Sequence, residues 1–350
     1  MSRILYIGDL NEYGRGFQRY RTLKDMGHDV VAFSHAKVSA PHRIDPPSFL
    51  YRVFWKLKIP LDDMHVNRKV IKAVRSSRFD LVWIEKGNMI WPWTLLRIKA
   101  FAPSIRLVSC SEDDMFASHG HSIWYRTGLR YYDVVFTTKA YNLAELKLWG
   151  AKQTKLFLDS YDEHIHRPWR LTDSERHRFA CDVSAIGAFE KQRAESLLYL
   201  AESGVRVLVW GNGWRQWADR HPFLVVKDEF LFGEDYAKAI CATKINVNFL
   251  RKINRDEVTS RSVEIPACGG FMLGERTARH MEFFQEGREA EFFASNEELL
   301  AKIQYYLAHD EEREKIAQAG RERCIRSGYS MRVQLAKMME EVAHCQSAPC

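Results

Sequence analysis

Residues 254–271 read NRDEVTSRSVEIPACGGF, and they are the most informative part of the sequence. It places two acids, Asp256 and Glu264, eight positions apart, with Arg261 between them. A short helix-like segment ends at a glycine pair directly before the apolar run 271–273, a pattern typical of a helix that turns into a strand. A carboxylate beside an arginine suits a sugar nucleotide, because the acid accepts hydrogen bonds from vicinal hydroxyls and the guanidinium binds a diphosphate bidentately.

The composition is that of an ordinary globular protein. The 350 residues are 46% apolar and 28% charged, which leaves room for two domains. No window approaches the roughly 20 apolar residues that a membrane span needs. The seven scattered cysteines lie mostly in apolar runs, so we expect reduced, buried thiols in a cytoplasmic protein and no zinc-type pairing. The net charge of +7 is compatible with solubility alone, with an anionic ligand or with an anionic membrane surface.

Short apolar runs alternate with amphipathic segments along both halves of the chain. In the first half the strand-like runs are 4–7, 30–33, 81–84, 106–110 and 134–137. A polar, proline-containing stretch at 158–172 reads as a linker. Strand-like runs resume at 182–186, 205–210, 224–226, 245–249 and 271–273. Such alternation predicts two α/β domains with parallel sheets, each with helices on both faces, and a ligand in a cleft at the carboxyl ends of the strands.

Four positions in the second half follow predicted strands and could contact a phosphate or a base. Gly187 precedes a helix start that carries Arg193, an arrangement that suits a phosphate at a helix N-terminus, although a solvated helix face has the same pattern. Gly211 permits a sharp turn, where we expect a backbone contact. Asn248 and Arg251 lie at or near the end of another strand, where ligands bind in such folds.

In the first half, acids and histidines concentrate after the strand-like run 106–110. Asp113 lies within the sequence SEDD at 111–114, and His119 follows shortly after. Either group could take a proton from an acceptor hydroxyl. The acids could also hold a divalent metal, although the spacing specifies none, or cap a helix N-terminus as solvated groups.

The glycine-containing loop 8–16 matches a dinucleotide fingerprint poorly. Its glycines are spaced wrongly, and no acid follows the second predicted strand, where Ser34 and His35 stand. No Walker-type loop is present. Both features count against a nicotinamide cofactor. We also expect no nucleic acid as a partner.

Over residues 134–323 the chain resembles the spore-maturation-type glycosyltransferases of the GT-B fold, which are related to the group 1 nucleotide-sugar transferases. The resemblance rests on KINVN at 244–248, SRSVEIPACGGF at 260–271 and the tail 297–323. It implies an α/β architecture with two Rossmann-like domains facing across a cleft. Residues 1–165 would form the acceptor domain, 175–330 the donor domain, and 331–350 a helix that packs back toward the first domain.

The resemblance also implies roles for single residues. Glu264 would bind the ribose hydroxyls, and Asp256 would reach the donor sugar. The family usually has glutamate at the position of Asp256, so the neighbouring Glu257 could substitute for this shorter acid. Such enzymes generally need no metal, because basic side chains stabilise the departing charge. Arg261 would neutralise the diphosphate together with one further cation among Lys191, Arg193 and Arg251.

We therefore expect a metal-independent, retaining transferase that moves a sugar from a nucleotide-sugar donor to a hydroxyl acceptor, without a cofactor. One alternative is a non-catalytic GT-B-like protein that binds nucleotide or serves as a scaffold. A nicotinamide-dependent oxidoreductase is a second alternative. The segment YRVFWKLK at 51–58 mixes aromatics and cations, so peripheral membrane contact competes with an ordinary helix that has a basic outer face.

Overall fold

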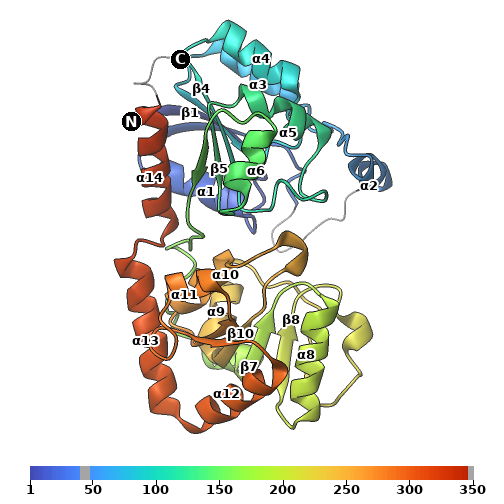
Figure 1. Cartoon of the computed structure of the whole chain (residues 1–350), viewed down its shortest axis with the longest axis vertical. Coiled ribbons are helices and arrows are strands. Elements are labelled where there is room, and N and C mark those ends of the chain that lie inside the picture. The colour runs from blue at the N-terminus through green and yellow to red at the C-terminus, as the bar shows by residue number, and fades with distance from the viewer. Residues whose placement is uncertain (40–47, 346–350) are drawn as a thin grey trace. The chain divides into compact units, whose positions relative to one another are not determined.

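The computed structural model describes residues 1–39 and 48–345, which divide into two compact units (Figure 1). One unit contains residues 1–158 together with the chain from Met331 onward, and the other contains Asp159–Ser330. Each unit is built on a parallel sheet of six strands. The expectation of two Rossmann-like α/β domains is confirmed. The chain leaves the first unit after Leu158, within the polar stretch that separates the two predicted alternations.

The sheet of the first unit has the order β2-β1-β3-β4-β5-β6. Five of its strands coincide with the predicted runs, but β6 was not predicted because it has only three residues and no apolar run. The strands are β1 (Arg3–Gly8), β2 (Asp29–Ser34), β3 (Leu81–Glu85), β4 (Arg106–Ser111), β5 (Val134–Thr137) and β6 (Thr154–Leu156). The helical elements are α1 (Arg15–Asp25), α2 (Phe49–Lys56), α3 (Val66–Ser76), α4 (Pro92–Phe101), α5 (Ile123–Gly128), η1 (Leu129–Tyr131), α6 (Asn142–Leu148) and α14 (Met331–His344).

Alternating side chains of the strands supply a core on each face of this sheet. Leu5 and Ile7 point to the face covered by α3, α4, α5 and α6. Ile4 and Tyr6 point to the opposite face, where α1 and α14 pack. In α14 the buried core residues recur at spacings of four, three and four positions, which aligns them in one stripe. They are Met331, Leu335, Met338 and Val342.

The sheet of the second unit has the order β12-β11-β10-β7-β8-β9. Its strands are β7 (Cys181–Ile186), β8 (Val207–Trp210), β9 (Leu224–Val226), β10 (Thr243–Asn248), β11 (Met272–Glu275) and β12 (Glu291–Phe293). Its helical elements are α7 (Asp173–Phe179), α8 (Lys191–Glu202), η2 (Arg215–Trp217), α9 (Gly233–Ala242), η3 (Lys252–Asn254), α10 (Ser260–Ala267), α11 (Ala278–Phe283), α12 (Asn296–Ala308) and α13 (Asp310–Arg326). Helices α8 and α12 pack on one face, and α7 and α9 pack on the other.

The connectivity of the second sheet fixes where a ligand belongs. The chain runs outward from β7 through β8 to β9, then crosses back and continues from β10 through β11 to β12. Strands β7 and β10 are therefore neighbours from which the chain proceeds in opposite directions. In doubly wound sheets, ligands bind at such a switch point, beyond the carboxyl ends of the strands.

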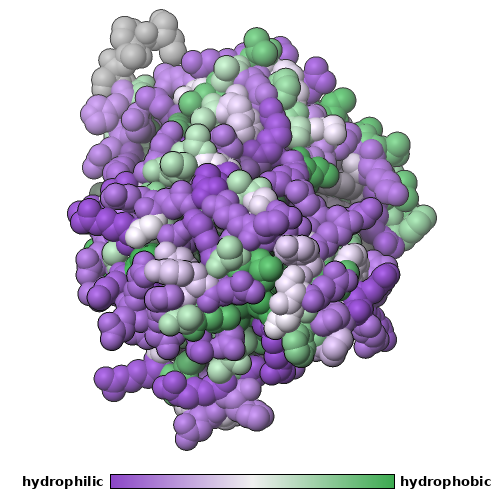
Figure 2. Space-filling model, turned by 60° about the horizontal axis from the view of Figure 1, so that its bottom comes forward, coloured by the Kyte–Doolittle hydropathy of each residue, from purple (hydrophilic) through white to green (hydrophobic). Residues whose placement is uncertain are grey.

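The face shown in Figure 2 is mostly hydrophilic, with hydrophobic residues in small groups between charged ones. Across residues 1–39 and 48–345, no helix combines the length and the apolar character that crossing a bilayer requires. The six described cysteines are free thiols, and three of them, Cys110, Cys268 and Cys324, are buried.

Candidate functional site

Two glycine loops meet at the carboxyl edge of the second sheet. Strand β7 continues into Gly187 and β8 into Gly211. The N–H of Gly187 donates to the Trp210 carbonyl (2.8 Å), and its own carbonyl accepts from Trp214 Nε1 (2.8 Å). A Cβ atom at Gly211 would lie 2.1 Å from the Gly187 carbonyl oxygen, so only glycine allows this approach. Gly211 therefore contacts the Gly187 backbone, and Trp214 packs in the core beneath the loops.

Two arginines converge on Gly187. A Cβ atom built on Gly187 would lie 2.6 Å from Arg193 Nη1 and 3.3 Å from Arg261 Nη2. Arg193 comes from the first turn of α8 and Arg261 from the first turn of α10. Two guanidinium groups, each from the first turn of a helix, thus face the loop after β7, and their positive charge attracts an anion.

Arg193 is buried beside like charge. Its side chain belongs to a residue that is only 5% exposed, and Nη1 donates to the Ala188 carbonyl (2.6 Å). Burial, together with the nearby positive charge of Arg261, lowers the pKa of Arg193 to about 10. Within the described part of the chain, Arg193 Nε and Nη2 have no hydrogen-bond partner. Buried donors without acceptors are unfavourable, so this guanidinium is ready to bind an anionic ligand.

Asn248 is the last residue of β10, and its side chain contacts α10. Its Nδ2 donates to Ser262 Oγ (3.0 Å), and its Oδ1 is 3.5 Å from Arg261 Nη1. Arg251, just beyond the strand, is exposed and pairs with Glu190 (3.0 Å). The exposed Lys191 lies 3.7 Å from Glu195 of its own helix. Of the three candidate cations, Arg193 is therefore the one that joins Arg261 at Gly187.

Glu264 is held on α10 by groups from outside that helix. Tyr236 of α9 donates its hydroxyl to Oε2 (2.9 Å), and His166 Nε2 lies 3.8 Å from Oε1. Glu264 is 8% exposed. Burial and the adjacent carboxylate raise the pKa of Tyr236 well above its usual value. The phenol therefore stays protonated and serves as a hydrogen-bond donor to Glu264. The structure therefore presents Glu264 as a fixed, largely buried carboxylate.

Asp256 precedes α10 in an irregular segment. It is buried, at 8% exposure, and its N–H donates to the Arg251 carbonyl (3.2 Å). The preceding Arg255 has a positive φ of 50°, which turns the chain at this point. Glu257 is exposed. Of the two adjacent acids, Asp256 is thus the buried one and Glu257 the exposed one.

In the first unit, the two predicted proton-transfer residues lie in the loop between β4 and α5. Asp113 forms an ion pair with Lys86, and this ammonium group lowers the pKa of the carboxyl. His119 is half-buried. Among the described residues, no group of three or more histidine, cysteine or acidic side chains is arranged to hold a metal ion.

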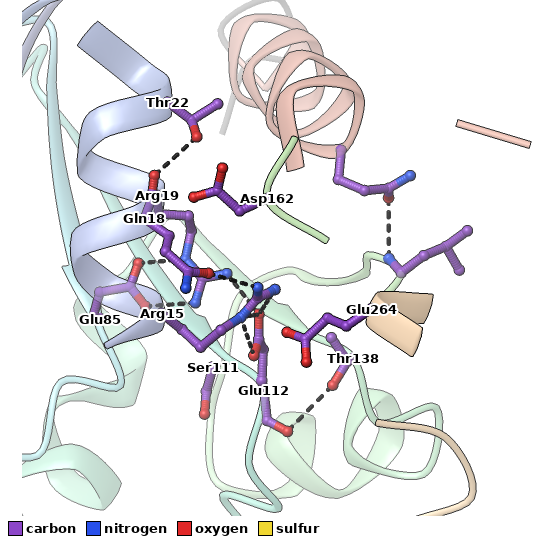
Figure 3. A network of polar contacts seen from close by, with 12 residues as sticks. Arg15, Gln18, Arg19, Thr22, Glu85, Ser111, Glu112, Thr138, Asp162 and Glu264 are labelled. Carbon is purple, nitrogen blue, oxygen red and sulfur yellow. Dashed lines mark hydrogen bonds and ion pairs between the residues drawn. The ribbon is translucent and has the colours of Figure 1, made fainter. Parts of the chain in front are cut away.

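Sequence reasoning missed a buried charge network in the same unit (Figure 3). Glu85 ends β3 and accepts from Arg19 Nε (2.8 Å) and Nη2 (3.0 Å). Arg19 Nη1 also donates to Glu112 Oε1 (2.8 Å), which accepts in addition from Arg15 Nη2 (3.0 Å). Burial acts to raise the pKa of Glu112, but the two arginines outweigh it and the pKa lies far below its usual value. Two signals were available in the sequence: the four-residue spacing of the arginines on one helix and the acidic run 112–114, which contains Glu112.

Known structures share this architecture over nearly the whole chain. The Anabaena protein HepE in complex with UDP and glucose covers 98% of this chain and 100% of its own, with a TM-score of 0.66 and 13% identity. Sucrose-phosphate synthase from Thermosynechococcus elongatus matches with the same coverage, a TM-score of 0.63 and 12% identity. An alpha-glucosyltransferase in complex with UDP-glucose and DNA containing an abasic site covers 97% of this chain and 99% of its own, with a TM-score of 0.62 and 12% identity.

A comparison with curated proteins finds no match. The family described as "Glycosyl transferase-like" matches residues 192–340, which run from α8 into α14. The matched segment includes α10 with Arg261 and Glu264, and the fold of the whole chain is that of GT-B glycosyltransferases. The chain therefore has the GT-B fold, and its residues 192–340 are similar to this glycosyl transferase-like family.

Proposed function

We propose that this protein is a glycosyltransferase that moves a sugar from a nucleotide-sugar donor to a hydroxyl acceptor. The observation that carries the proposal is the convergence of Arg193 and Arg261 on Gly187, at the switch point of the second sheet. A nucleoside diphosphate presents the negative charge that two adjacent guanidinium groups require. The known complexes of the same fold with UDP and UDP-glucose support this choice of ligand.

Glu264 is the group that we assign to the ribose. Tyr236 and His166 hold the Glu264 carboxylate in place, and Glu264 lies on the same helix as Arg261. Neighbouring turns of α10 would therefore bind the ribose hydroxyls and the diphosphate. Asp256 remains our candidate for contact with the donor sugar. Gly187, Gly211, Asn248 and Arg251 complete the loops and strand ends that surround this ligand.

The transfer that we propose needs no metal. As the bond between sugar and diphosphate breaks, negative charge grows on the diphosphate, and Arg193 and Arg261 would stabilise it before the reaction begins. We further propose that the anomeric configuration of the sugar is retained. The anomeric proton of the product, observed by NMR, distinguishes retention from inversion.

The acceptor hydroxyl is assigned to the first unit. Asp113 is a weak base there, because its ion pair with Lys86 favours the ionised form. It is better suited to orient a hydroxyl, which leaves His119 as our candidate for removing the proton.

We also propose a cytoplasmic location with peripheral membrane contact through α2 and the residue that follows it. Phe49, Leu50 and Leu57 are between 61% and 71% exposed, and Arg52 and Lys56 are exposed among them. Apolar side chains and cations in this mixture suit an anionic bilayer surface. Co-sedimentation with phosphatidylserine vesicles at low salt tests the idea, with phosphatidylcholine vesicles as the control. A protein that stays in the supernatant with both contradicts it.

The donor is identified by incubating the protein with pooled nucleotide sugars and following each by mass spectrometry. A transferase converts one donor, and thermal shift with the matching nucleoside diphosphate shows stabilisation. Arg193→Met should abolish both effects, whereas Arg206→Met should not, because Arg206 lies at the amino end of β8, at the opposite edge of the sheet. Binding without turnover of any donor would instead favour the non-catalytic alternative. The specific indication for that alternative is Asp256, which stands where the family that this chain resembles usually has glutamate.

A further inference from the structure

His280, on α11, links two parts of the second unit although its ring is completely buried. Its Nδ1 lies 2.6 Å from the backbone carbonyl oxygen of Glu275, and its Nε2 lies 2.7 Å from Ser262 Oγ. The ring stacks on Phe292, with centroids 5.2 Å apart. Both ring nitrogens therefore have defined partners.

The partners decide where the hydrogen atoms lie. A carbonyl oxygen only accepts, so Nδ1 must carry a hydrogen and donate it to Glu275. Burial lowers the pKa of His280 to about 4, so the ring is neutral near pH 7 and Nε2 has no hydrogen. It follows that Ser262 donates its hydroxyl hydrogen to Nε2.

With its hydrogen committed to the histidine, Ser262 Oγ acts as an acceptor toward its other neighbours. The N–H of Thr259 lies 3.2 Å from it and Asn248 Nδ2 lies 3.0 Å from it. The amide of Asn248 must therefore turn its NH2 group to Ser262. This leaves Oδ1 facing Arg261, 3.5 Å from Nη1. The opposite orientation would place an NH2 group against the guanidinium.

We propose that His280 is a positioning residue for nucleotide binding. Through Ser262 and Asn248 it fixes the amide that faces Arg261, and it thereby holds this guanidinium in place for the diphosphate. The inference rests on the proposed function, because Arg261 is assigned to the diphosphate there. In this role His280 does not contact the ligand. It acts on Arg261 through two intervening side chains, those of Ser262 and Asn248.

Two variants separate this role from simple packing. His280→Phe keeps a ring on Phe292 but removes both nitrogens, whereas His280→Gln can restore an acceptor near the position of Nε2. The probe is whichever of UDP, GDP, dTDP and ADP binds the wild type most tightly by calorimetry. We expect His280→Phe to weaken its binding about tenfold, the equivalent of one hydrogen bond to a charged group, and His280→Gln to bind more tightly than His280→Phe.

Phe292→Leu is the matched control. It loosens the packing of the same ring while leaving its hydrogen bonds in place, so it should lower the melting temperature without a comparable loss of affinity. If His280→Phe binds as the wild type does, or if its loss of affinity only parallels its loss of stability as in Phe292→Leu, the positioning role is wrong.

A readout without nucleotide completes the test. The ring ¹⁵N shifts of His280 in the free protein at neutral pH should report hydrogen on Nδ1 and none on Nε2. The opposite tautomer overturns the inference whatever the affinities are. A wild type that binds none of the four nucleotides overturns the proposed function, and with it the role of His280, even if the tautomer is as expected.

Discussion

Arg193 and Arg261 place a guanidinium nitrogen 2.6 and 3.3 Å from a single point, the position of a Cβ atom at residue 187. Two positive groups approach so closely because position 187 has no side chain. The burial that lowers the pKa of Arg193 to about 10 also leaves two of its nitrogens without acceptors in the described structure. An anion bound beside the two guanidinium groups would reduce the repulsion between their charges.

Gly187→Ala should therefore abolish nucleotide binding while the protein still folds. The new methyl group would meet the end of the Arg193 side chain and not the backbone, so the arginine can move away, and the cost to the fold is the backbone strain of an alanine at a φ of 156°. Calorimetry with a nucleoside diphosphate and a thermal melt measure the two effects. Gly204→Ala is the control, because Gly204 also has a positive φ (87°) but has no atom within 4 Å of the added Cβ. Equal losses in both variants would assign the effect to backbone strain.

Gly211→Ala should behave differently from Gly187→Ala. Here the added Cβ meets the backbone oxygen of Gly187 at 2.1 Å, so the two loops must separate. We expect a lower melting temperature as well as lost binding. A variant at position 211 with full stability would show that the loops are less closely packed than the structure indicates.

Tyr236→Phe should weaken nucleotide binding by freeing the Glu264 carboxylate. The phenol donates to Oε2 at 2.9 Å, and a hydrogen bond to a charged acceptor contributes about 1.5–3 kcal/mol. Tyr306→Phe is a matched control, because Tyr306 makes an equivalent 2.8 Å bond to Glu291. Both variants should lose similar stability in urea unfolding, but only Tyr236→Phe should lose affinity. Unchanged affinity in Tyr236→Phe would remove Glu264 from the binding site.

Asp256→Asn should retain nucleotide binding and lose turnover. Asn keeps the size of the side chain but removes the charge that we assign to the donor sugar. The exposed Glu257 is the internal competitor for this role, so Glu257→Gln is tested beside it. Donor consumption measured by mass spectrometry should fall only in Asp256→Asn. A loss confined to Glu257→Gln would transfer the role to the neighbouring residue.

Arg19→Met should destabilise the first unit strongly. Glu85 would lose two hydrogen bonds from Arg19 and remain buried, and Glu112 would lose one. Removing one partner of a buried ion pair costs about 3–5 kcal/mol of unfolding free energy. The double variant Arg19→Met with Glu85→Gln should recover part of this loss, as measured by urea unfolding. Additive losses in the double variant would contradict the pairing.

The strand and helix pattern was predictable from the sequence wherever a buried element left an uninterrupted apolar run. Strand β6 has a single apolar residue, and β12 has only the pair Phe292 and Phe293, so neither was predicted. Among the candidate cations, the sequence left the choice open between Lys191, Arg193 and Arg251, since burial decides between them and burial is a tertiary property. The pair Arg19 and Glu85 was missed for the same reason. Charged residues are mostly exposed, so nothing in the sequence indicates that these two are buried.

The unfolding free energy should fall between pH 6.5 and 4 through His280. Its pKa is about 4 in the folded protein and near 6.5 in the unfolded chain, because burial disfavours the charged ring. Within this range the unfolded chain binds a proton that the folded protein does not, so lowering the pH favours unfolding. The contribution reaches about 3 kcal/mol at pH 4 and levels off at about 3.4 kcal/mol below it.

His280→Gln isolates this contribution, since glutamine does not titrate. Burial also lowers the pKa values of His28 and His121, but these residues act equally in both proteins. Urea unfolding at pH 6.5, 5.5 and 4.5 should therefore give a steeper pH dependence for the wild type than for the variant. Parallel curves would mean that His280 is protonated in the folded protein as readily as in the unfolded chain, which is incompatible with a bare Nε2 that accepts from Ser262.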